Sequence, residues 1–241
     1  MSHRYLIAAA AAALVAGGCS FSADAEERDA GPEVERRYEV GEFDRIAVAG
    51  PYEVRVISGT QGPVTARGGA NLLAETDVTV EDGTLKIMPR KKKGLRWHWN
   101  NGTAQFTVNA AALRGATIAG SGGIAVDRMR GDFEGEVAGS GDLKLGAMEG
   151  GKVKLAIAGS GDIEAAGKVD SVSLKIAGSG DIRAGGLASR AAEVSIAGSG
   201  NVEANASENA EVSIMGSGNV DVTGGAKCKA TKAGSGNVRC S

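Results

Sequence analysis

The sequence predicts an all-β fold, a single-stranded β-solenoid with coils of about 19 residues. Ala-Gly-Ser-Gly recurs six times and Met-Gly-Ser-Gly once, and successive serines are 19, 20, 19, 20, 18 and 18 residues apart. A period near 20 residues is typical of solenoids, in which each repeat stacks on the previous one. Polar and apolar residues alternate between these tetrapeptides, for example over 152–157, which indicates strands with one buried face.

Each Gly-Ser-Gly is expected to form a corner between two strands of one coil. Glycine accepts positive φ and has no Cβ to collide with the coils above and below. The serine is expected to bond the turn backbone or its neighbours in the stack. We therefore interpret seven serines as a structural turn ladder: Ser121, Ser140, Ser160, Ser179, Ser199, Ser217 and Ser235.

Apolar residues stand three positions before these serines, and stacking at about 4.8 Å would align them in a buried column. Its members are Ile118, Val137, Ile157, Ile176, Ile196 and Ile214. Six such spacings give a stack on the order of 29 Å.

Asp142, Asp162 and Asp181 follow three of the corners, and Asn takes this place in the later coils. Gly-x-Asp turns resemble calcium-binding solenoid repeats, but those repeats have a period of about nine residues. Pectate-lyase-like β-helices also use acidic clusters, but no column of Lys or Arg accompanies these aspartates. We therefore expect them to cap turns rather than to bind metal or catalyse a reaction.

Composition excludes several other classes of protein. Glycine accounts for 38 of 241 residues without a three-residue period, which excludes collagen, and a hydrophobic content of 42% excludes a disordered chain. A net charge of −2 argues against a nucleic-acid partner. Two His and three Cys leave little for a metal centre or a His-activated nucleophile. We predict a non-catalytic protein with no catalytic residue, cofactor or metal.

Residues 1–18 have the pattern of a lipoprotein signal peptide. A basic start precedes an apolar run that is too short to span a bilayer, and small residues lead directly to Cys19. This resembles a bacterial lipobox, in which the cysteine is lipidated and becomes the mature N-terminus. The alternative is an ordinary signal peptide cleaved nearby. Ser20 implies the outer membrane of a Gram-negative bacterium, and residues 19–37 are expected to be a tether.

The remaining chain, 38–241, is expected to be one domain with regular repeats over about 114–241. Its first part is less regular. Ala49–Val54 looks like a worn copy of the corner, so we expect the solenoid to begin there. Residues 71–73 are compatible with one helical turn, and 78–87 predict a hairpin with an Asp-Gly turn.

Cys228 and Cys240 occupy predicted inward positions of the last coil. In an oxidising compartment a disulfide is expected, and closing this loop would stabilise the fold by roughly 2–3 kcal/mol. Lys232 takes the place that Ile holds in earlier coils, which suits an end that no further coil covers.

Residues 90–102 carry five cations and both tryptophans of the chain, and we expect them at the tip of a hairpin. The tryptophans could stack on a sugar ring while the cations bind phosphates of lipopolysaccharide or another acidic envelope polymer. The alternative is an exposed tip whose tryptophan rings cover an apolar flank of the solenoid. The candidate ligand-binding residues are Arg90, Lys91, Lys92, Lys93, Arg96, Trp97 and Trp99.

Several segments resemble the head GIN domain family, which is described as adhesin heads of auto-transporters. They are Phe43-Asp44-Arg45-Ile46, Gly50-Pro51-Tyr52-Glu53-Val54, Gly83-Thr84-Leu85-Lys86-Ile87 and the Gly-Ser-Gly-Asp-Ile copies. The resemblance covers about residues 38–240 and implies a right-handed β-helix. An auto-transporter needs a membrane barrel or a trimeric anchor, and in their place the lipid on Cys19 is expected to hold the protein.

The function predicted is that of an envelope lipoprotein, an adhesin-like or structural interaction module that presents a rigid β-solenoid. Its expected partners are the membrane, through the lipid, and an envelope glycan or another surface protein. Two alternatives stay open. One is a periplasmic or surface binder of acidic glycan or lipopolysaccharide that uses 90–102, and the other is a β-helix enzyme acting on polysaccharides.

Overall fold

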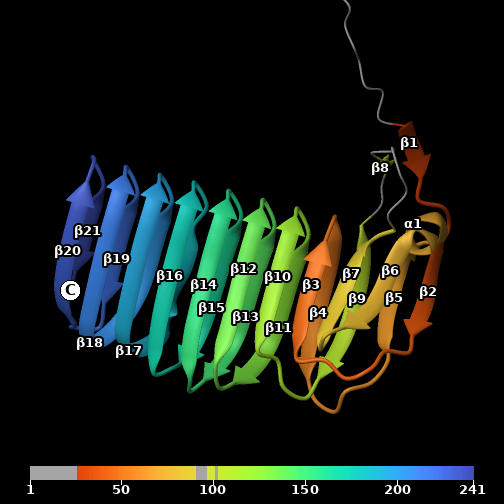
Figure 1. Cartoon of the computed structure of the whole chain (residues 1–241), viewed down its shortest axis with the longest axis horizontal. Helices are drawn as coiled ribbons and strands as arrows, with labels where there is room; N and C mark the ends of the chain where they lie inside the picture. Colours follow the sequence, from red (N-terminus) through yellow and green to blue (C-terminus); the bar gives the residue numbers. More distant parts are fainter. Residues whose placement is uncertain (1–25, 91–96, 101–102) are drawn as a thin grey trace, which may run out of the picture.

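The protein is a β-solenoid in which parallel strands stack in two faces along one axis (Figure 1). The computed structural model describes residues 26–90, 97–100 and 103–241. In each regular turn the chain runs along the first face, turns at Gly-Ser-Gly, and returns along the second face. The predicted fold class is confirmed.

Hydrogen-bonded ladders join each strand to the equivalent strand of the next turn, for example Val153 to Val172 and Ile157 to Ile176. The first face contains β7 (Thr84–Pro89), β3 (Arg45–Ala49), β10 (Gly115–Gly120), β12 (Phe133–Gly139), β14 (Lys152–Gly159), β16 (Ser171–Gly178) and β20 (Lys227–Ala233). The second contains β9 (Ala104–Ala110), β4 (Tyr52–Ser58), β11 (Gly123–Arg130), β13 (Asp142–Glu149), β15 (Asp162–Lys168), β19 (Asn219–Thr223) and β21 (Asn237–Cys240). β17 (Ile182–Gly198) and β18 (Asn201–Gly216) each cross from the second face of one turn to the first face of the next.

The core consists of the predicted apolar columns. Ile157 pairs in register with Ile176, which pairs with Ile196, and each is at most 2% exposed. Because every inward residue lies directly over its equivalent, one column of Ile and Val runs through the stack. Opposite the Gly-Ser-Gly corners, the chain returns from the second face to the first along a wider and less regular edge, which we call the wide edge. There the ladders shift register, as between Leu145 and Met148.

The order of the first turns in space differs from their order in sequence. β3 and β4 form a solenoid turn in register with β10 and β11, so the worn corner at residues 49–54 is confirmed. However, β7 and β9 pair with the other sides of β3 and β4 and therefore lie outside them. The outermost turn buries Leu85, Ile87 and Phe106 against β3 and β4. The expectation that the stack begins at 49–54 is therefore corrected.

Antiparallel elements close the N-terminal end of the stack. β5 (Val64–Gly69) pairs with β9, β2 (Glu33–Tyr38) pairs with β5, and β6 (Thr76–Glu81) pairs with β7. The helical turn α1 (Ala70–Ala74) buries Leu72 and Leu73. The predicted hairpin at 78–87 is confirmed, with Asp82 and Gly83 both at positive φ in its turn.

β2 lies inside the range that the sequence assigned to the tether. It begins at Glu33 and is paired with β5 along its whole length. The strand is partly exposed on both faces and has few apolar residues, so hydrophobic alternation did not reveal it. The ordered sheet therefore starts earlier than residue 38.

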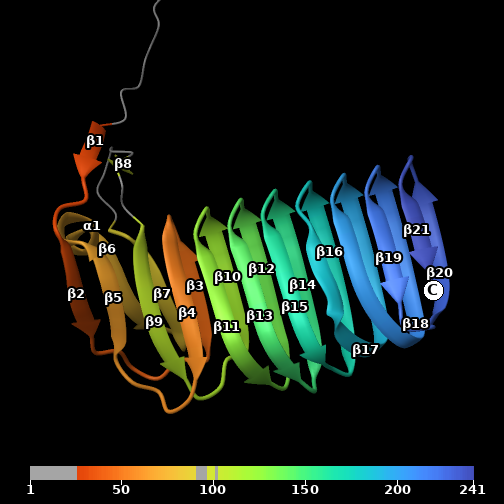
Figure 2. The same cartoon turned by 180° about the vertical axis from the view of Figure 1, so that it is seen from behind.

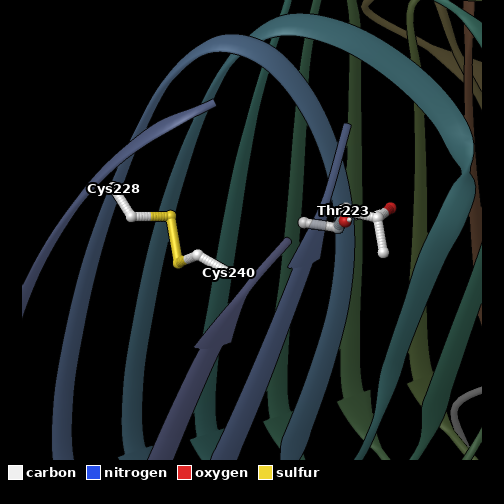
Figure 3. The surroundings of a disulfide bond; sticks show 4 residues. Thr223, Cys228 and Cys240 are labelled. Carbon is white, nitrogen blue, oxygen red and sulfur yellow. Dashed lines mark hydrogen bonds between the residues drawn. A yellow bond between two sulfur atoms is a disulfide. The ribbon is translucent and has the colours of Figure 1, made fainter. Parts of the chain in front are cut away.

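Within the described residues no strand pairs with the outer side of the C-terminal turn, and every residue of β20 is exposed. The predicted disulfide is confirmed, since the side chains of Cys228 and Cys240 meet across this turn (Figure 3). Lys232 pairs with Ile214 and its Nζ donates a hydrogen bond to the carbonyl oxygen of Gly236 at 3.2 Å. The ammonium group thus ends the apolar column with a polar contact.

Candidate functional site

The Gly-Ser-Gly corners form one straight edge of the molecule, which we call the serine edge and define by the seven corner serines. The serines are exposed, and adjacent corners are in close contact through their backbones. The N–H of Ser179 donates to the carbonyl oxygen of Gly159 at 2.9 Å. Gly178 has φ +139°, and a Cβ there would lie 2.1 Å from the same oxygen. The glycines therefore permit the corners to stack, while the role of the serine hydroxyls stays a prediction.

A ladder of Asp and Asn side chains runs beside the serine edge on the second face. The Oδ1 of Asp162 accepts a hydrogen bond from the N–H of Asp181 at 3.1 Å, and the Oδ1 of Asp181 accepts two from Asn201 at 2.9 Å. Asn219 and Asn237 continue the ladder. These side chains bind the backbone of the next turn, as expected of turn caps.

Arg183 crosses this ladder and contacts both neighbouring carboxylates. Its guanidinium lies 3.0 Å from Asp162 and 3.4 Å from Asp181. The hydrogen bond and the charge of Asp162 raise the pKa of Arg183. Within the described residues no group of three or more His, Cys, Asp or Glu is arranged to hold a metal ion.

Residues 90–103, which we call the insertion, connect β7 to β9 in the sequence. The corner between β3 and β4 consists of only Gly50 and Pro51. The end of β7 lies beside this corner, since a Cβ on Gly50 would be 3.3 Å from Cγ of Pro89. The expectation of a hairpin at 90–102 is wrong. β7 pairs with β3 and β6, whereas β9 pairs with β4 and β5, so the two strands lie on different faces and the insertion connects these faces.

The insertion contains β8 (Trp97–Asn100), which pairs in parallel with β1 (Glu26–Asp29). Both strands project beyond the serine edge at the N-terminal end of the stack (Figures 1 and 2). Trp97 and Trp99 thus lie in a strand that borders the N-terminal segment. Sequence reasoning missed this pairing, because β1 lies in the range expected to be a tether.

The other predicted site residues are dispersed. Arg90 is held against the N-terminal end of the stack, where its Nε lies 2.9 Å from Oδ1 of Asp77 and its N–H donates to the carbonyl oxygen of Glu75 at 2.7 Å. The predicted cations Lys91, Lys92, Lys93 and Arg96 lie outside the described residues, as does Cys19. Cys228 and Cys240 lie at the opposite end of the stack from the insertion.

One polar cluster on the wide edge has no sequence signal, because its members are 69 residues apart. Asp127 accepts hydrogen bonds from the N–H and hydroxyl of Ser58, both at 2.9 Å, and from the N–H of Arg128 at 2.6 Å. Burial alone would raise the pKa of Asp127, but these hydrogen bonds lower it. The cluster borders a depression of about 330 Å³ at the point where β4 leaves the stack.

A second carboxyl is perturbed beside the aspartate ladder. Glu53 extends over Gly123, where a Cβ would lie 2.4 Å from its Oε2. Burial and the negative charge of Asp142 raise the pKa of Glu53. Both groups contact a neighbouring turn, Asp127 through Ser58 and Glu53 over Gly123.

No helix in the described part of the chain has the length and apolar character needed to cross a membrane. No curated protein matches the chain.

Solved structures share the fold over most of their length. A putative adhesin from Bacteroides fragilis superposes with a TM-score of 0.79 at 22% identity, over 89% of this chain and 100% of its own. A putative lipid binding protein from Parabacteroides distasonis gives 0.74 at 26% identity, over 90% and 100%. A putative adhesin from Parabacteroides merdae gives 0.69 at 18% identity, also over 90% and 100%.

The family model described as "Putative auto-transporter adhesin, head GIN domain" matches residues 42–226. This range includes the turn made by β3 and β4, the N-terminal closing elements from β5 onward, and the Gly-Ser-Gly turns as far as the last but one. The chain therefore belongs to the head GIN domain family.

Proposed function

We propose that the protein is a non-catalytic lipoprotein of the outer membrane that is anchored through lipid on Cys19 and presents its solenoid as an adhesin-like interaction module. The observation that supports this most is the large share of the described chain that forms the solenoid. Nearly all described residues build one stack with continuous backbone ladders, and its outward side chains are available to a partner. The family, and two structural relatives that are described as putative adhesins, agree with such a role.

A module of this kind works through rigidity rather than through a reaction centre. Parallel ladders, buried columns and a disulfide at the free end fix the outward residues at regular intervals. A rigid surface loses little conformational entropy on binding, so weak individual contacts can add up along the stack. The perturbed groups Asp127, Glu53 and Arg183 are used in contacts between turns.

The lipid anchor is tested by replacing Cys19 with Ser in the full-length chain. We expect the wild-type protein to incorporate labelled fatty acid and to sediment with the outer membrane. The Cys19→Ser protein should do neither. A Cys228→Ser/Cys240→Ser variant is the matched control, since it removes the two other cysteines without touching the lipobox. Fatty-acid labelling that survives Cys19→Ser would refute the anchor.

A second candidate function is binding of an acidic glycan or lipopolysaccharide through residues 90–102. Two observations favour it. The insertion is far longer than a corner requires, and one structural relative at 26% identity is called a lipid binding protein. Trp97→Ala with Trp99→Ala should abolish binding to lipopolysaccharide vesicles and leave the unfolding temperature nearly unchanged, with Lys154→Ala as a surface control. A fall in stability of several kcal/mol would instead make these rings part of the packed structure.

A further inference from the structure

The N-terminal segment enters the fold at the serine edge. β1 pairs with β8, and β8 belongs to the insertion that replaces a corner of this edge. Both strands project beyond the edge on the same side, as Figures 1 and 2 show. Whatever holds the chain upstream of Glu26 is therefore connected to this edge and to the N-terminal end of the stack.

The length of chain upstream limits how the body is oriented. Six residues separate Cys19 from Glu26, and seven extended steps reach at most about 25 Å. The first face has eight inter-strand spacings between β7 and β20, which places the C-terminal turn about 38 Å from the first one. The chain between Cys19 and Glu26 is thus too short for the C-terminal end to reach the bilayer. It would have to be fully extended for the wide edge to reach the bilayer.

Charge distinguishes the surfaces that stay within reach. Residues 29–44 and 59–90, which close the N-terminal end, carry 10 acidic and 5 basic side chains, so that anionic lipid would repel this end. The two faces carry charged columns, such as Lys154 and Glu193 on the first face. The seven tetrapeptides of the serine edge, in contrast, contain only Ala, Met, Gly and Ser. The tetrapeptides themselves thus carry no charge to desolvate, and the neighbouring carboxylates of Asp162 and Asp181 are paired with Arg183. The exposed serine hydroxyls can bond lipid phosphates.

We propose that the serine edge faces the bilayer that carries the lipid anchor, with the solenoid axis along the membrane surface. The partner of this edge is a lipid headgroup layer. The charged wide edge then points away from the membrane, and with the outer parts of the two faces it is the surface offered to partners. The charged side chains on that edge include Arg128, Arg130, Asp132, Glu149, Lys152, Lys168, Asp170, Arg190 and Glu208. This proposal rests on the lipid anchor proposed above.

The test uses full-length lipidated protein in vesicles of anionic phospholipid, with a fluorophore on one introduced cysteine. No native thiol competes, because the chain has three cysteines, of which one is lipidated and two form the disulfide. Ser217→Cys places the label on the serine edge, at the corner that directly follows β18, and Glu208→Cys places it on the wide edge, within β18. Both side chains are exposed and distant from the insertion. Ser121→Cys reports the other end of the serine edge.

With a quencher on the lipid headgroups, we expect a larger loss of fluorescence at Ser217 and Ser121 than at Glu208. Equal, weak quenching at Ser217 and Glu208 with strong quenching at Ser121 would indicate a solenoid standing on its N-terminal end and would overturn the proposal. Stronger quenching at Glu208 than at Ser217 would also overturn it. Flotation separates the two claims, since failure of the wild-type protein to float with vesicles refutes the anchor, whereas flotation with the wrong quenching pattern refutes only the orientation.

Discussion

Replacing Gly178 by alanine tests whether the corners must stack in direct backbone contact. The residue has φ +139°, a conformation that costs a side chain of order 1–3 kcal/mol. A Cβ would also lie 2.1 Å from the carbonyl oxygen of Gly159, so the turn has to shift, at about 1–3 kcal/mol more. We therefore expect Gly178→Ala to lower the free energy of unfolding by about 2–6 kcal/mol.

Two other glycines separate the contributions to this loss. Gly131 has φ +85° but nothing within 4 Å of a Cβ, so alanine there should cost only the backbone term of roughly 1–2 kcal/mol. Gly59 has neither positive φ nor a close neighbour, and alanine should stabilise the fold by about 0.4–1 kcal/mol by restricting the unfolded chain. Urea unfolding followed by far-UV circular dichroism gives all three values under the same conditions.

The three variants are compared by their change in the free energy of unfolding. Because each corner contacts the turns on both sides, damage in the middle of the stack weakens two interfaces. If Gly178→Ala costs no more than Gly131→Ala, the corners do not require close stacking, and our explanation of the repeated glycines is incorrect.

Three further changes have defined outcomes. Removing the disulfide by Cys228→Ser with Cys240→Ser should lower stability by about 2–3 kcal/mol, measured by thermal unfolding, and a reductant should have no effect on the variant. Lys232→Ile should restore the apolar column at the uncovered end and cause concentration-dependent association in analytical ultracentrifugation, whereas Lys232→Gln should stay monomeric if the apolar end is the cause. Asp127 has a lowered pKa in the folded state, so its contribution to stability is present above the unfolded pKa and is lost as pH falls through the folded one. Asp127→Asn should therefore destabilise the protein at pH 7 and have less effect in acid, and an equal loss at both pH values would contradict this assignment.

The regular part of the fold was accessible to sequence reasoning because its interactions repeat. Each coil places the same residue types at the same positions, so the column through Ile157 and Ile176 and the glycines at the corners are visible without a structure. The pairing of Cys228 with Cys240 followed from the same register. Even the worn corner at Gly50 kept enough of the pattern to be recognised.

The N-terminal part was less predictable because its contacts join distant segments only once. Nothing local indicates that β7 and β9 lie outside β3 and β4, since all four strands have the same alternation. The expected hairpin at 90–102 is wrong for the same reason. It requires β7 and β9 to pair with each other, whereas β7 pairs with β3 and β9 pairs with β4. β1 and β2 are polar strands stabilised by their ladders, and hydrophobic periodicity does not detect such strands.

Labelling of intact cells tests most directly whether the solenoid is displayed at the cell surface. Full-length Glu208→Cys is treated with a maleimide that does not cross the outer membrane, and the same cells are treated again after that membrane is opened. A surface adhesin predicts full labelling of intact cells, because Glu208 would then be exposed to the medium on the wide edge, which points away from the anchored bilayer. Labelling only after the membrane is opened would confine the protein to the periplasm and contradict a role in surface adhesion.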